Sequence, residues 1–337
     1  MKVSVVILNW NGKALMEEFL PSVLKNTPSE IAEIVVADNG STDNSIAMLK
    51  EKFSSVRLIA FDKNYGFAEG YNKAISRIDS AYTVLLNSDV EVTPGWLDAP
   101  LAVLDAGETI AAVQPKIRSQ RNRNYFEYAG AAGGFIDKYG YPYCRGRVMY
   151  AVEEDNGQYD RQTDILWATG ACLFIRTGIY KKEGGLDARF FAHQEEIDMC
   201  WRLCSRGYRI VCTPESVVYH VGGATLNVES PHKTFLNFRN NLLMLYKNLP
   251  EKDIRKTLRI RYGLDVIAAV KFFITGNLKN AAAVFRAQRE FRRLKKEYLP
   301  IRTENLQKTI TPEITEIRKK SLLFSFYIER KQKFSQL

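Results

Sequence analysis

Acidic side chains follow two apolar runs in the N-terminal third of the chain, at positions where a buried strand would end. Asp38 ends the run IAEIVVAD, and Asp89 follows the run VLLN directly after Ser88. A carboxylate at the tip of a central strand has little structural purpose, because burying an unpaired charge costs free energy. Such a group can accept hydrogen bonds from a base or ribose, as we expect for Asp38. It can also bind a divalent cation, Mg²⁺ or Mn²⁺, that bridges a diphosphate, as we expect for Asp89.

A glycine-containing turn in the segment DKNYGFAEGYNKA, residues 62–74, is a further candidate for nucleotide contacts. Asn64 and Gly66 lie just before a predicted helix, and Asn72 lies within it. Backbone N–H groups at a helix start can bind a phosphate or a nucleoside. A glycine turn by itself is weak evidence for a binding site, so this segment only supports the prediction based on Asp38 and Asp89.

Three acidic residues lie close together in the segment FFAHQEEIDMCWRLCSRG, residues 190–207, near a predicted helix start. At about 100° per residue, Glu195, Asp198 and Arg202 share one face of that helix, whereas Glu196 points elsewhere. Acids in a first turn complement the helix dipole, and Asp198 can pair with Arg202 at i, i+4. This structural explanation covers Asp198 and leaves Glu196 as the freer candidate for a general base.

The elements that must position these residues alternate between strand and helix. The hydrophobic pattern predicts strands at 3–8, 31–38, 56–61 and 82–87, with helices at 13–26, 45–53 and 68–78 between them. Continuous apolar strands separated by helices indicate an α/β fold with a parallel sheet covered on both faces. Ligands bind at the carboxyl ends of such strands, so the loops after the four strands are expected to form the site.

The rest of the chain is expected to cover this sheet and to extend it. Residues 120–165 are rich in tyrosine and glycine and are predicted to form a long loop or small hairpins. A strand is predicted at 171–176, a helix at 193–207 and a strand at 208–220. From His232 onward the periodicity is helical.

Charge is distributed unevenly along the chain. The net charge is +10, but the residues from Lys233 to Leu337 carry 24 lysines and arginines against nine acids, a balance of +15. The preceding 232 residues have a balance of −5. A nucleic-acid-binding groove would interleave lysines and arginines with aromatic residues. The first 232 residues, which hold the motifs, are instead mildly acidic, so we expect no nucleic-acid partner.

Cysteine usage and hydropathy indicate a cytoplasmic protein. The five cysteines form no CxxC pair, so we expect free thiols and neither a disulfide framework nor a zinc site. The N-terminus lacks the long apolar region and the cleavage site of a signal peptide. No window approaches the roughly 18 uninterrupted apolar residues of a spanning helix.

The order of the motifs resembles the bacterial family-2 glycosyltransferases with the GT-A fold, particularly the rhamnosyltransferase-like branch. The resemblance covers residues 1 to about 250, and its motifs are VSVVILNWNG, ADNGSTDNS, NYGFAEGYN, LLNSDVEVTPGWL, WATGACLFIR, FFAHQEEIDMCWRLCSRG and VVYHVGG. Each motif alone is unspecific, but the combination is highly specific. It implies a Rossmann-like, mostly parallel sheet with helices on both faces, here followed by a C-terminal helical extension.

The resemblance also implies roles for individual residues. Asp38 contacts the nucleotide base, and Asp89 matches the last acid of the family's Asp-x-Asp metal motif. Glu196 matches the second acid of its Glu-Asp pair, the catalytic base, and His220 matches a histidine that completes the metal site in some members. The other residues expected to bind the nucleotide-sugar donor are Asn9, Asn64, Gly66, Asn72, Asn87 and Ser88.

Two positions depart from the family pattern. Asn87 replaces the first acid of the metal motif and offers a carbonyl oxygen without charge, so metal binding is expected to be weaker or to depend on His220. Glu196 replaces the more usual aspartate and is one methylene longer, which keeps the chemistry and alters the position of the acceptor.

These residues can support a direct displacement. Glu196 takes the proton from the acceptor hydroxyl while a cation at Asp89 stabilises the departing diphosphate. One base without a nucleophilic carboxylate implies inversion at the anomeric carbon. The resemblance suggests dTDP-rhamnose or a UDP-sugar as donor and a saccharide or lipid-linked saccharide as acceptor, in cell-surface polysaccharide synthesis. The sugar or acceptor pocket is expected to involve Trp167, Thr169, Gly170 and Glu195. Core packing is the alternative for Trp167.

We divide the chain into a GT-A catalytic domain at 1–230 and a basic helical region at 231–337. Residues 1–100 are expected to bind the nucleotide-sugar, and residues 101–230 to bind the acceptor and carry out catalysis. Apolar residues at helical spacing within 260–277, together with the basic charge, predict contact with the inner face of the plasma membrane. Alternatively, the same residues pack on the catalytic domain or on a second subunit in a homodimer.

Two other functions fit the sequence less well. A nucleotidyltransferase would need a glycine-rich first loop with basic phosphate anchors, and NWNGK offers only Lys13. A non-catalytic nucleotide-binding or nucleic-acid-binding module is favoured only by the basic tail. It would bind oligonucleotides with a steep salt dependence and turn over no nucleotide-sugar.

Overall fold

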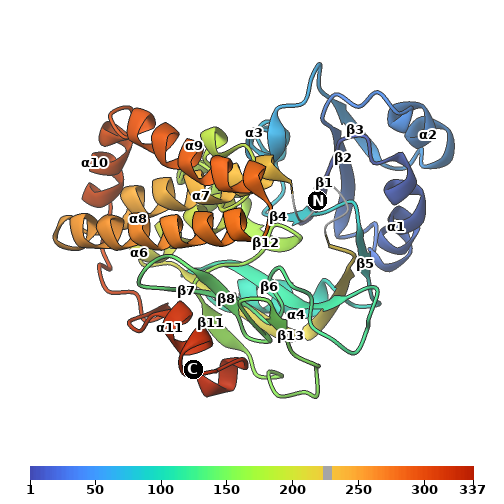
Figure 1. The fold of residues 1–337 in the computed structure, drawn as a ribbon. Helices are drawn as coiled ribbons and strands as arrows, with labels where there is room; N and C mark the ends of the chain where they lie inside the picture. Colours follow the sequence, from blue (N-terminus) through green and yellow to red (C-terminus); the bar gives the residue numbers. More distant parts are fainter. Residues whose placement is uncertain (223–229) are drawn as a thin grey trace.

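The computed structural model describes residues 1–222 and 230–337, and it is a mixed α/β fold built on one large sheet (Figure 1). The strand order is β11-β13-β6-β12-β4-β1-β2-β3, with β5 paired to β13. The predicted α/β class is confirmed. Gly223, the last residue of the VVYHVGG motif, lies outside the described residues.

The parallel part of the sheet consists of four strands close to the predicted ranges. Their bounds are Val3–Asn9 for β1, Ala32–Asp38 for β2, Arg57–Ala60 for β3 and Tyr82–Leu86 for β4. Alternate side chains enter the two opposite core layers, since Val3, Val5 and Ile7 belong to one buried cluster and Val6 to the other. Burial on both faces explains why these strands are apolar throughout.

The remaining strands of the sheet run in both directions. Their bounds are Val90–Val92 for β5, Ile110–Ser119 for β6, Thr163–Ile165 for β11, Cys172–Arg176 for β12 and Arg209–His220 for β13. Strand β12 is antiparallel to both β4 and β6, and β13 is parallel to β6. The ends of β1, β2, β4, β6 and β13 and the start of β12 therefore meet at one edge of the sheet.

Helices cover both faces of the sheet. They are α1 at Lys13–Asn26, α2 at Ser45–Lys52, α3 at Gly66–Ile75, α4 at Asp98–Asp105, α5 at Thr177–Lys182 and α6 at Glu195–Ser205, with a short 3₁₀ turn at Ala188–Phe190. The spacing of Met16, Leu20 and Val23 gives α1 one apolar face, which packs on the layer that contains Val3. Tyr71 and Ile75 of α3 pack in the opposite layer.

The tyrosine-rich and glycine-rich segment forms a second, small sheet, which agrees with the predicted hairpins. Its strand order is β10-β9-β8-β7-β14. The bounds are Gly134–Asp137 for β7, Pro142–Cys144 for β8, Arg147–Val148 for β9, Ala151–Val152 for β10 and Ile317–Arg318 for β14. Strand β14 comes from the C-terminal region, so that region completes this sheet.

The C-terminal helices gather at the side of the molecule opposite β3 and α2 (Figure 1). They are α7 at Pro231–Asn248, α8 at Glu251–Ile274, α9 at Leu278–Leu294, α10 at Leu299–Gln307 and α11 at Leu322–Tyr327, followed by a 3₁₀ turn at Phe334–Gln336. Leu243, Phe291 and Phe326 belong to the same buried cluster as Val6 and Tyr71. The helical region therefore shares its core with the sheet.

Two expectations about the whole chain can be checked directly. All five cysteines are buried and free, as predicted. Among the residues that the structure describes, none of the helices combines the length and the apolar character needed to cross a bilayer.

Candidate active site

Asn9, Asp38 and Ser41 form a hydrogen-bonded group at the carboxyl ends of β1 and β2. The parallel register pairs Asn9 with Asp38, and Asn9 Nδ2 donates to Asp38 Oδ1 at 2.9 Å. The other carboxylate oxygen accepts the backbone N–H of Ser41 at 2.9 Å. Both side chains are buried, and Asn9 Oδ1 has no partner among the described residues. A buried acceptor without a protein partner is able to accept a hydrogen bond from a ligand or from water.

The turn around Asn64 and Gly66 is held by hydrogen bonds within the protein. Asn64 Oδ1 accepts the N–H of Gly66 at 2.7 Å, and the N–H groups of Phe67 and Ala68 donate to the carbonyl of Phe191 at 2.7 and 3.2 Å. These N–H groups at the start of α3 are therefore paired within the protein, and contact of Asn64 and Gly66 with the donor stays a prediction. Gly66 has a φ of +78°, and a Cβ atom there would lie 2.5 Å from the Phe191 ring.

Asn72 is also hydrogen-bonded within the protein, and its contact with the donor stays a prediction. Its Nδ2 donates to the carbonyl of Leu186 at 2.8 Å. Its Oδ1 accepts the N–H of Leu186 at 3.0 Å and the hydroxyl of Tyr180 at 2.7 Å. Asn72 therefore ties α3 to the segment after α5.

Asn87, Asp89 and His220 come together where β4 and β13 end. Asp89 Oδ1 lies 3.1 Å from His220 Nε2, and Asn87 Nδ2 lies 3.4 Å from the same nitrogen. Strand β5 pairs Val90 with His220, which fixes this approach. Asp89 and His220 are buried, and Ser88 is partly exposed between Asn87 and Asp89.

Glu127 lies on the other side of the His220 ring. Its Oε2 is 3.5 Å from His220 Nδ1. Burial alone would lower the pKa of His220, but the two carboxylates outweigh it and raise the pKa to about 10. Burial also opposes ionisation of Asp89, yet the hydrogen bond and the charge of His220 hold its pKa below the usual value. A carboxylate behind a histidine is a common way to orient a metal-binding imidazole.

The donor set at this position would fit a divalent cation that also binds a diphosphate, provided that the cation displaces the proton that Asp89 and Glu127 hold on His220. Adjacent ligands of an octahedral ion, at bond lengths of about 2.1 Å, lie about 3 Å apart, close to the 3.1 Å between Asp89 and His220. The carboxylate of Asp89 and the amide oxygen of Asn87 are ligands of the kind that Mg²⁺ and Mn²⁺ both accept. Within residues 1–222 and 230–337 no three His, Cys, Asp or Glu side chains are arranged to hold a metal by themselves. The cation would therefore need oxygens from the donor.

Glu195 and Glu196 begin α6 beside the start of β12. Glu195 is 3% exposed, whereas Glu196 is partly exposed, and one carboxylate oxygen of each has no hydrogen-bond partner among the described residues. Burial raises the pKa of Glu196, although backbone N–H groups, including that of Gly170, act in the opposite direction. Burial and the charge of Glu196 raise the pKa of Glu195 further. Raised carboxylate pKa values of this kind are typical of general bases.

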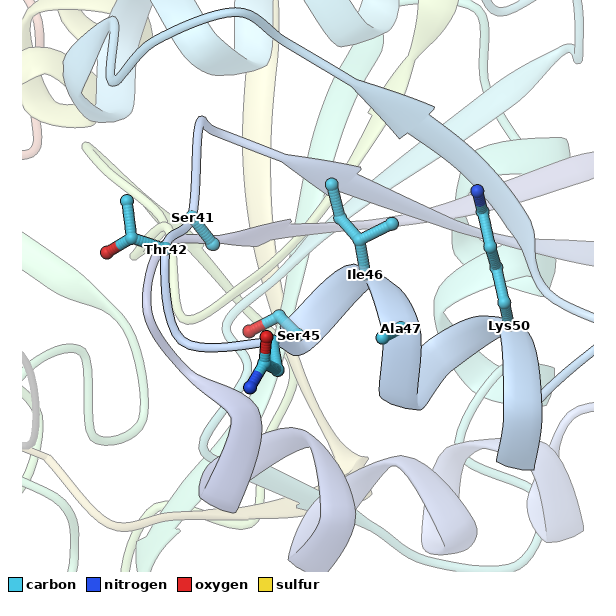
Figure 2. A pocket seen from close by; sticks show the side chains of 7 residues that line it. Ser41, Thr42, Ser45, Ile46, Ala47 and Lys50 are labelled. Carbon is cyan, nitrogen blue, oxygen red and sulfur yellow. The ribbon is translucent and has the colours of Figure 1, made fainter.

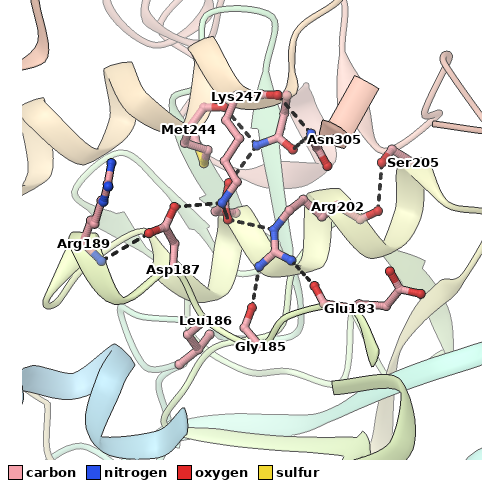
Figure 3. A network of polar contacts seen from close by, with 12 residues as sticks. Glu183, Gly185, Leu186, Asp187, Arg189, Arg202, Ser205, Met244, Lys247 and Asn305 are labelled. Atoms are coloured by element: carbon pink, nitrogen blue, oxygen red, sulfur yellow. Dashed lines mark hydrogen bonds and ion pairs between the residues drawn. The ribbon is translucent and has the colours of Figure 1, made fainter. Parts of the chain in front are cut away.

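Both carboxylate oxygens of Asp198 have partners within the protein, and one of these partners is Arg202, as the i, i+4 spacing predicted. Its Oδ2 lies 3.0 Å from Arg202 Nε and 2.8 Å from Lys247 Nζ, and its Oδ1 accepts from Asn248 at 2.8 Å. Figure 3 shows this network, in which Lys247 also pairs with Asp187 at 2.9 Å. The network joins α6 to α7 and leaves Asp198 no free acceptor at the site.

The turn that precedes Glu195 is strained and is held by one asparagine. Phe191, His193 and Gln194 all have positive φ, between 64° and 73°. Such conformations cost free energy for residues other than glycine and persist where the surroundings enforce them. Asn240 of α7 is buried, and its Nδ2 lies within 2.8–2.9 Å of the carbonyls of Phe190, Ala192 and His193. Helix α7 therefore holds the turn that carries the two glutamates.

The WATGA turn, residues 167–171, precedes β12 and packs mostly within the protein. Trp167 is 3% exposed and its indole N–H donates to the carbonyl of Phe135 at 3.0 Å, so core packing, the alternative weighed for this residue, is what the structure shows. Thr169 is buried and its N–H donates to Gln114 Oε1 at 2.9 Å. Gly170 faces the Phe67 ring, which a Cβ atom would approach to 2.7 Å.

An open depression of the surface lies beside the site at the start of α2 (Figure 2). It is lined by Ser41, Thr42, Asn44, Ser45, Ile46, Ala47 and Lys50. It shares Ser41 with the Asp38 group, but none of its side chains is a carboxylate or an imidazole. The groups that can do chemistry therefore lie at the edge of the sheet and not in this depression.

Three residues of the site escaped the sequence interpretation. They are Asn39, which accepts the N–H of Tyr65 at 3.0 Å, together with Glu127 and Asn240. Asn240 could have been found, because an asparagine pair interrupts the apolar pattern of FRNNLLML. Glu127 lies in a segment without periodicity, where no signal marks it.

Comparison with known proteins places these motifs in one family. The family described as glycosyl transferase family 2 matches residues 4–183, just over half of the chain. The chain is 25% identical over 231 residues to the N-acetylglucosaminyl-diphospho-decaprenol L-rhamnosyltransferase of Mycobacterium tuberculosis strain H37Rv. That alignment covers 64% of this chain and 75% of the relative.

Two solved structures share the fold. The chain superposes on GalNAc-T7 in complex with UDP, GalNAc and Mn²⁺ with a TM-score of 0.58 and 16% identity, covering 73% of this chain and 48% of that one. It superposes on residues 1–349 of Staphylococcus aureus TarS with UDP-GlcNAc with a TM-score of 0.57 and 15% identity, covering 91% and 89%. The fold is therefore the GT-A fold that the resemblance predicted.

Proposed function

The chain belongs to glycosyl transferase family 2, and from this premise we propose that it transfers a sugar from a nucleotide-sugar to an acceptor hydroxyl with inversion of the anomeric carbon. The observation that carries the proposal is the contrast between two acids of α6, Glu196 and Asp198. Glu196 keeps a free carboxylate oxygen at the edge of the sheet, whereas Asp198 is enclosed by Arg202 and Lys247.

Glu196 would accept the proton of the acceptor hydroxyl as that oxygen attacks the sugar. Its pKa is raised by burial, so its carboxylate is a stronger base than an exposed glutamate. The carboxylate of Glu196 accepts the backbone N–H of Gly170. The carbonyl of the next residue, Ala171, accepts the N–H of Asn87 at 3.0 Å, so Glu196 lies near the residues of the metal site. Since the described residues offer no nucleophilic carboxylate beside it other than the deeply buried Glu195, a single displacement is the simpler route.

The nucleotide would lie along the ends of β1, β2 and β4. Asp38, held by Asn9 and Ser41, offers its carboxylate to the base or ribose. Asp89 and His220, with Asn87, would hold a divalent cation against the diphosphate. When bound, such a cation supplies positive charge to the leaving diphosphate.

The donor and the acceptor are proposed by similarity. The mycobacterial relative is named as a rhamnosyltransferase that acts on a lipid diphosphate, so we propose dTDP-rhamnose or a UDP-sugar as donor and a lipid-linked saccharide as acceptor. The reaction would serve cell-surface polysaccharide synthesis at the inner face of the plasma membrane.

Thermal unfolding with a panel of nucleotide-sugars, each with and without Mn²⁺ or Mg²⁺, tests the proposal. A ligand at 100 times its dissociation constant stabilises the folded state by about 2.7 kcal/mol, so the correct donor raises the melting temperature by several degrees. The free nucleotide and the free sugar serve as matched controls. If no nucleotide-sugar stabilises the protein more than its nucleotide alone, the proposed donor class is wrong.

A further inference from the structure

The hairpin formed by α8 and α9 exposes an unusual group of large apolar side chains. Seven of them lie within residues 266–285: Val266, Ile267, Val270, Phe273, Ile274, Leu278 and Phe285, each between 40% and 77% exposed. Along α8 they recur at i, i+1, i+4, i+7 and i+8, so they occupy one side of the helix. Exposed apolar patches of this kind mark sites of contact with a partner or a membrane.

The opposite side of α8 is occupied within the protein. Leu258, Arg261, Asp265 and Ala269 are buried, and the helix packs against α7 and α9. The stripe expected from the sequence consists of Leu264, Ile267, Ala268, Lys271 and Phe272, of which Ile267 and Lys271 are exposed and the other three are partly exposed. The exposed face therefore overlaps the expected stripe at Ile267 and Lys271, and no other part of the described chain covers it.

The exposed charges close to this apolar group have one sign, whereas the acids of α8 and α9 other than Asp265 lie at the far ends of the two helices, at Glu251, Asp253 and Glu290. Between residues 254 and 289 the sequence contains a single acid, Asp265, which is fully buried and accepts a hydrogen bond from Arg261 at 3.2 Å. The exposed charged residues on α8 and α9 near the apolar group are Lys271, Lys279, Arg286 and Arg289. An apolar face with exclusively basic neighbours matches a surface of negative charge over an apolar interior.

We propose that the α8–α9 hairpin lies in the interface of an anionic lipid membrane, with Phe273 and Ile274 inserted among the lipid chains and Lys271 and Lys279 near the head groups. This membrane contact rests on the proposed function, because the proposed acceptor is a lipid-linked saccharide that the enzyme would reach at the membrane surface. A second copy of the chain fits less well, because a two-fold interface would bring the same basic patch against itself.

Co-sedimentation of the full chain with phosphatidylcholine vesicles, with or without phosphatidylglycerol, tests this inference. The protein should pellet with the anionic vesicles and release at high salt. Neutralising Lys271 and Lys279 together to glutamine should lower the partition coefficient by roughly 25-fold, about fivefold for each base. The double change Phe273→Ser and Ile274→Ser should abolish binding. Matched controls are Ile328→Ser, since Ile328 is as exposed as Ile267 at 66%, and Lys25→Gln, and both should bind like the wild type.

Two results would overturn the inference. One is that the Phe273 and Ile274 variant, folded by circular dichroism, binds anionic vesicles as strongly as the wild type. The other is that sedimentation velocity shows a wild-type dimer that this variant converts to a monomer, which assigns the face to a second copy. Donor-dependent stabilisation is measured on the same proteins and should not change in any variant. If the donor fails to stabilise the wild type or a variant, that result bears on the proposed function and not on the membrane contact.

Discussion

At the scale of single residues, the candidate site depends on which acids are paired. Glu196 and Asp198 are two positions apart, yet one has a free oxygen and the other is shared among Arg202, Lys247 and Asn248. The i, i+4 spacing predicted the pairing with Arg202. The contacts from α7 could not be predicted, because they come from residues about fifty positions later in the chain.

The raised pKa of Glu196 predicts an acidic limb in the pH profile of the reaction. A general base works when it is deprotonated, and burial shifts its pKa above the ordinary 4.5. We therefore expect kcat/KM to fall as the pH is lowered through a pKa above 4.5 and to level off above it. Steady-state rates across pH, with folding checked by circular dichroism, measure this. A rate that is constant down to pH 4.5 would contradict the assignment.

Asp89 should carry the cation dependence of donor binding. We expect Asp89→Ala to bind the nucleotide-sugar weakly and to be insensitive to a chelator, because the carboxylate nearest His220 is lost. Isothermal titration with and without Mn²⁺ measures both properties. Asp98→Ala is a control carboxylate outside the site. If Asp89→Ala keeps the wild-type affinity and chelation changes neither protein, the metal assignment fails.

At the scale of elements, the sequence predicted the parallel strands and the helices between them to within a few residues. It did not predict β6, although that strand is ten residues long, nor β5, which is three residues long, nor the pairing of β14 with β7. Short strands carry little periodicity, and Ile317 of β14 lies 181 residues from its partner Ile136. The strained turn at 191–194 was also invisible, since its conformation is enforced by α7 and not by its own residues.

Asn240 is therefore predicted to position the base without contacting the substrate. Asn240→Asp removes the N–H donors and places a carboxylate against three carbonyls, so the turn should relax. A displacement of about 1 Å can cost roughly 10²-fold, so we expect kcat to fall by that amount with little change in donor affinity. Asn237→Asp is the matched control, since Asn237 donates to the carbonyl of Lys233 within α7 and has no other hydrogen bond to the described residues.

Steady-state kinetics and donor titration separate the two effects. A melting curve shows whether the Asn240 variant is folded, and Asn240→Gln, which keeps the amide, should recover part of the rate. If Asn240→Asp is folded and turns over like the wild type, α7 does not position the base.

At the scale of the whole molecule, the division of the chain at residue 230 stays a prediction, and helix α7 begins next to it at Pro231. The helical region nevertheless shares its core with the sheet, and Lys247 neutralises the buried Asp198. Charge and periodicity revealed that the region is basic and helical. They could not reveal that it holds α6, because that function depends on tertiary contacts.

A chain that ends at residue 230 is therefore expected not to fold. It would expose the core that Leu243 and Phe291 cover, and it would leave Asp198 with Arg202 alone. Losing one partner of a buried charge costs about 3–5 kcal/mol, a large share of the 5–15 kcal/mol that stabilises a typical domain. Circular dichroism melting tests this. A cooperative transition with donor-dependent stabilisation would show that the catalytic part is independent.

The most direct test of the whole account is sugar transfer by Glu196→Gln, measured with the stabilising nucleotide-sugar and its acceptor. We expect donor binding to be retained and the transfer rate to fall by about 10² to 10⁴-fold, because the amide cannot accept the proton. Asp198→Asn should instead lower the melting temperature, since Lys247 and Arg202 lose their counter-charge. Full turnover in Glu196→Gln, together with loss of turnover in a folded Asp198→Asn, would contradict the account and reassign the base.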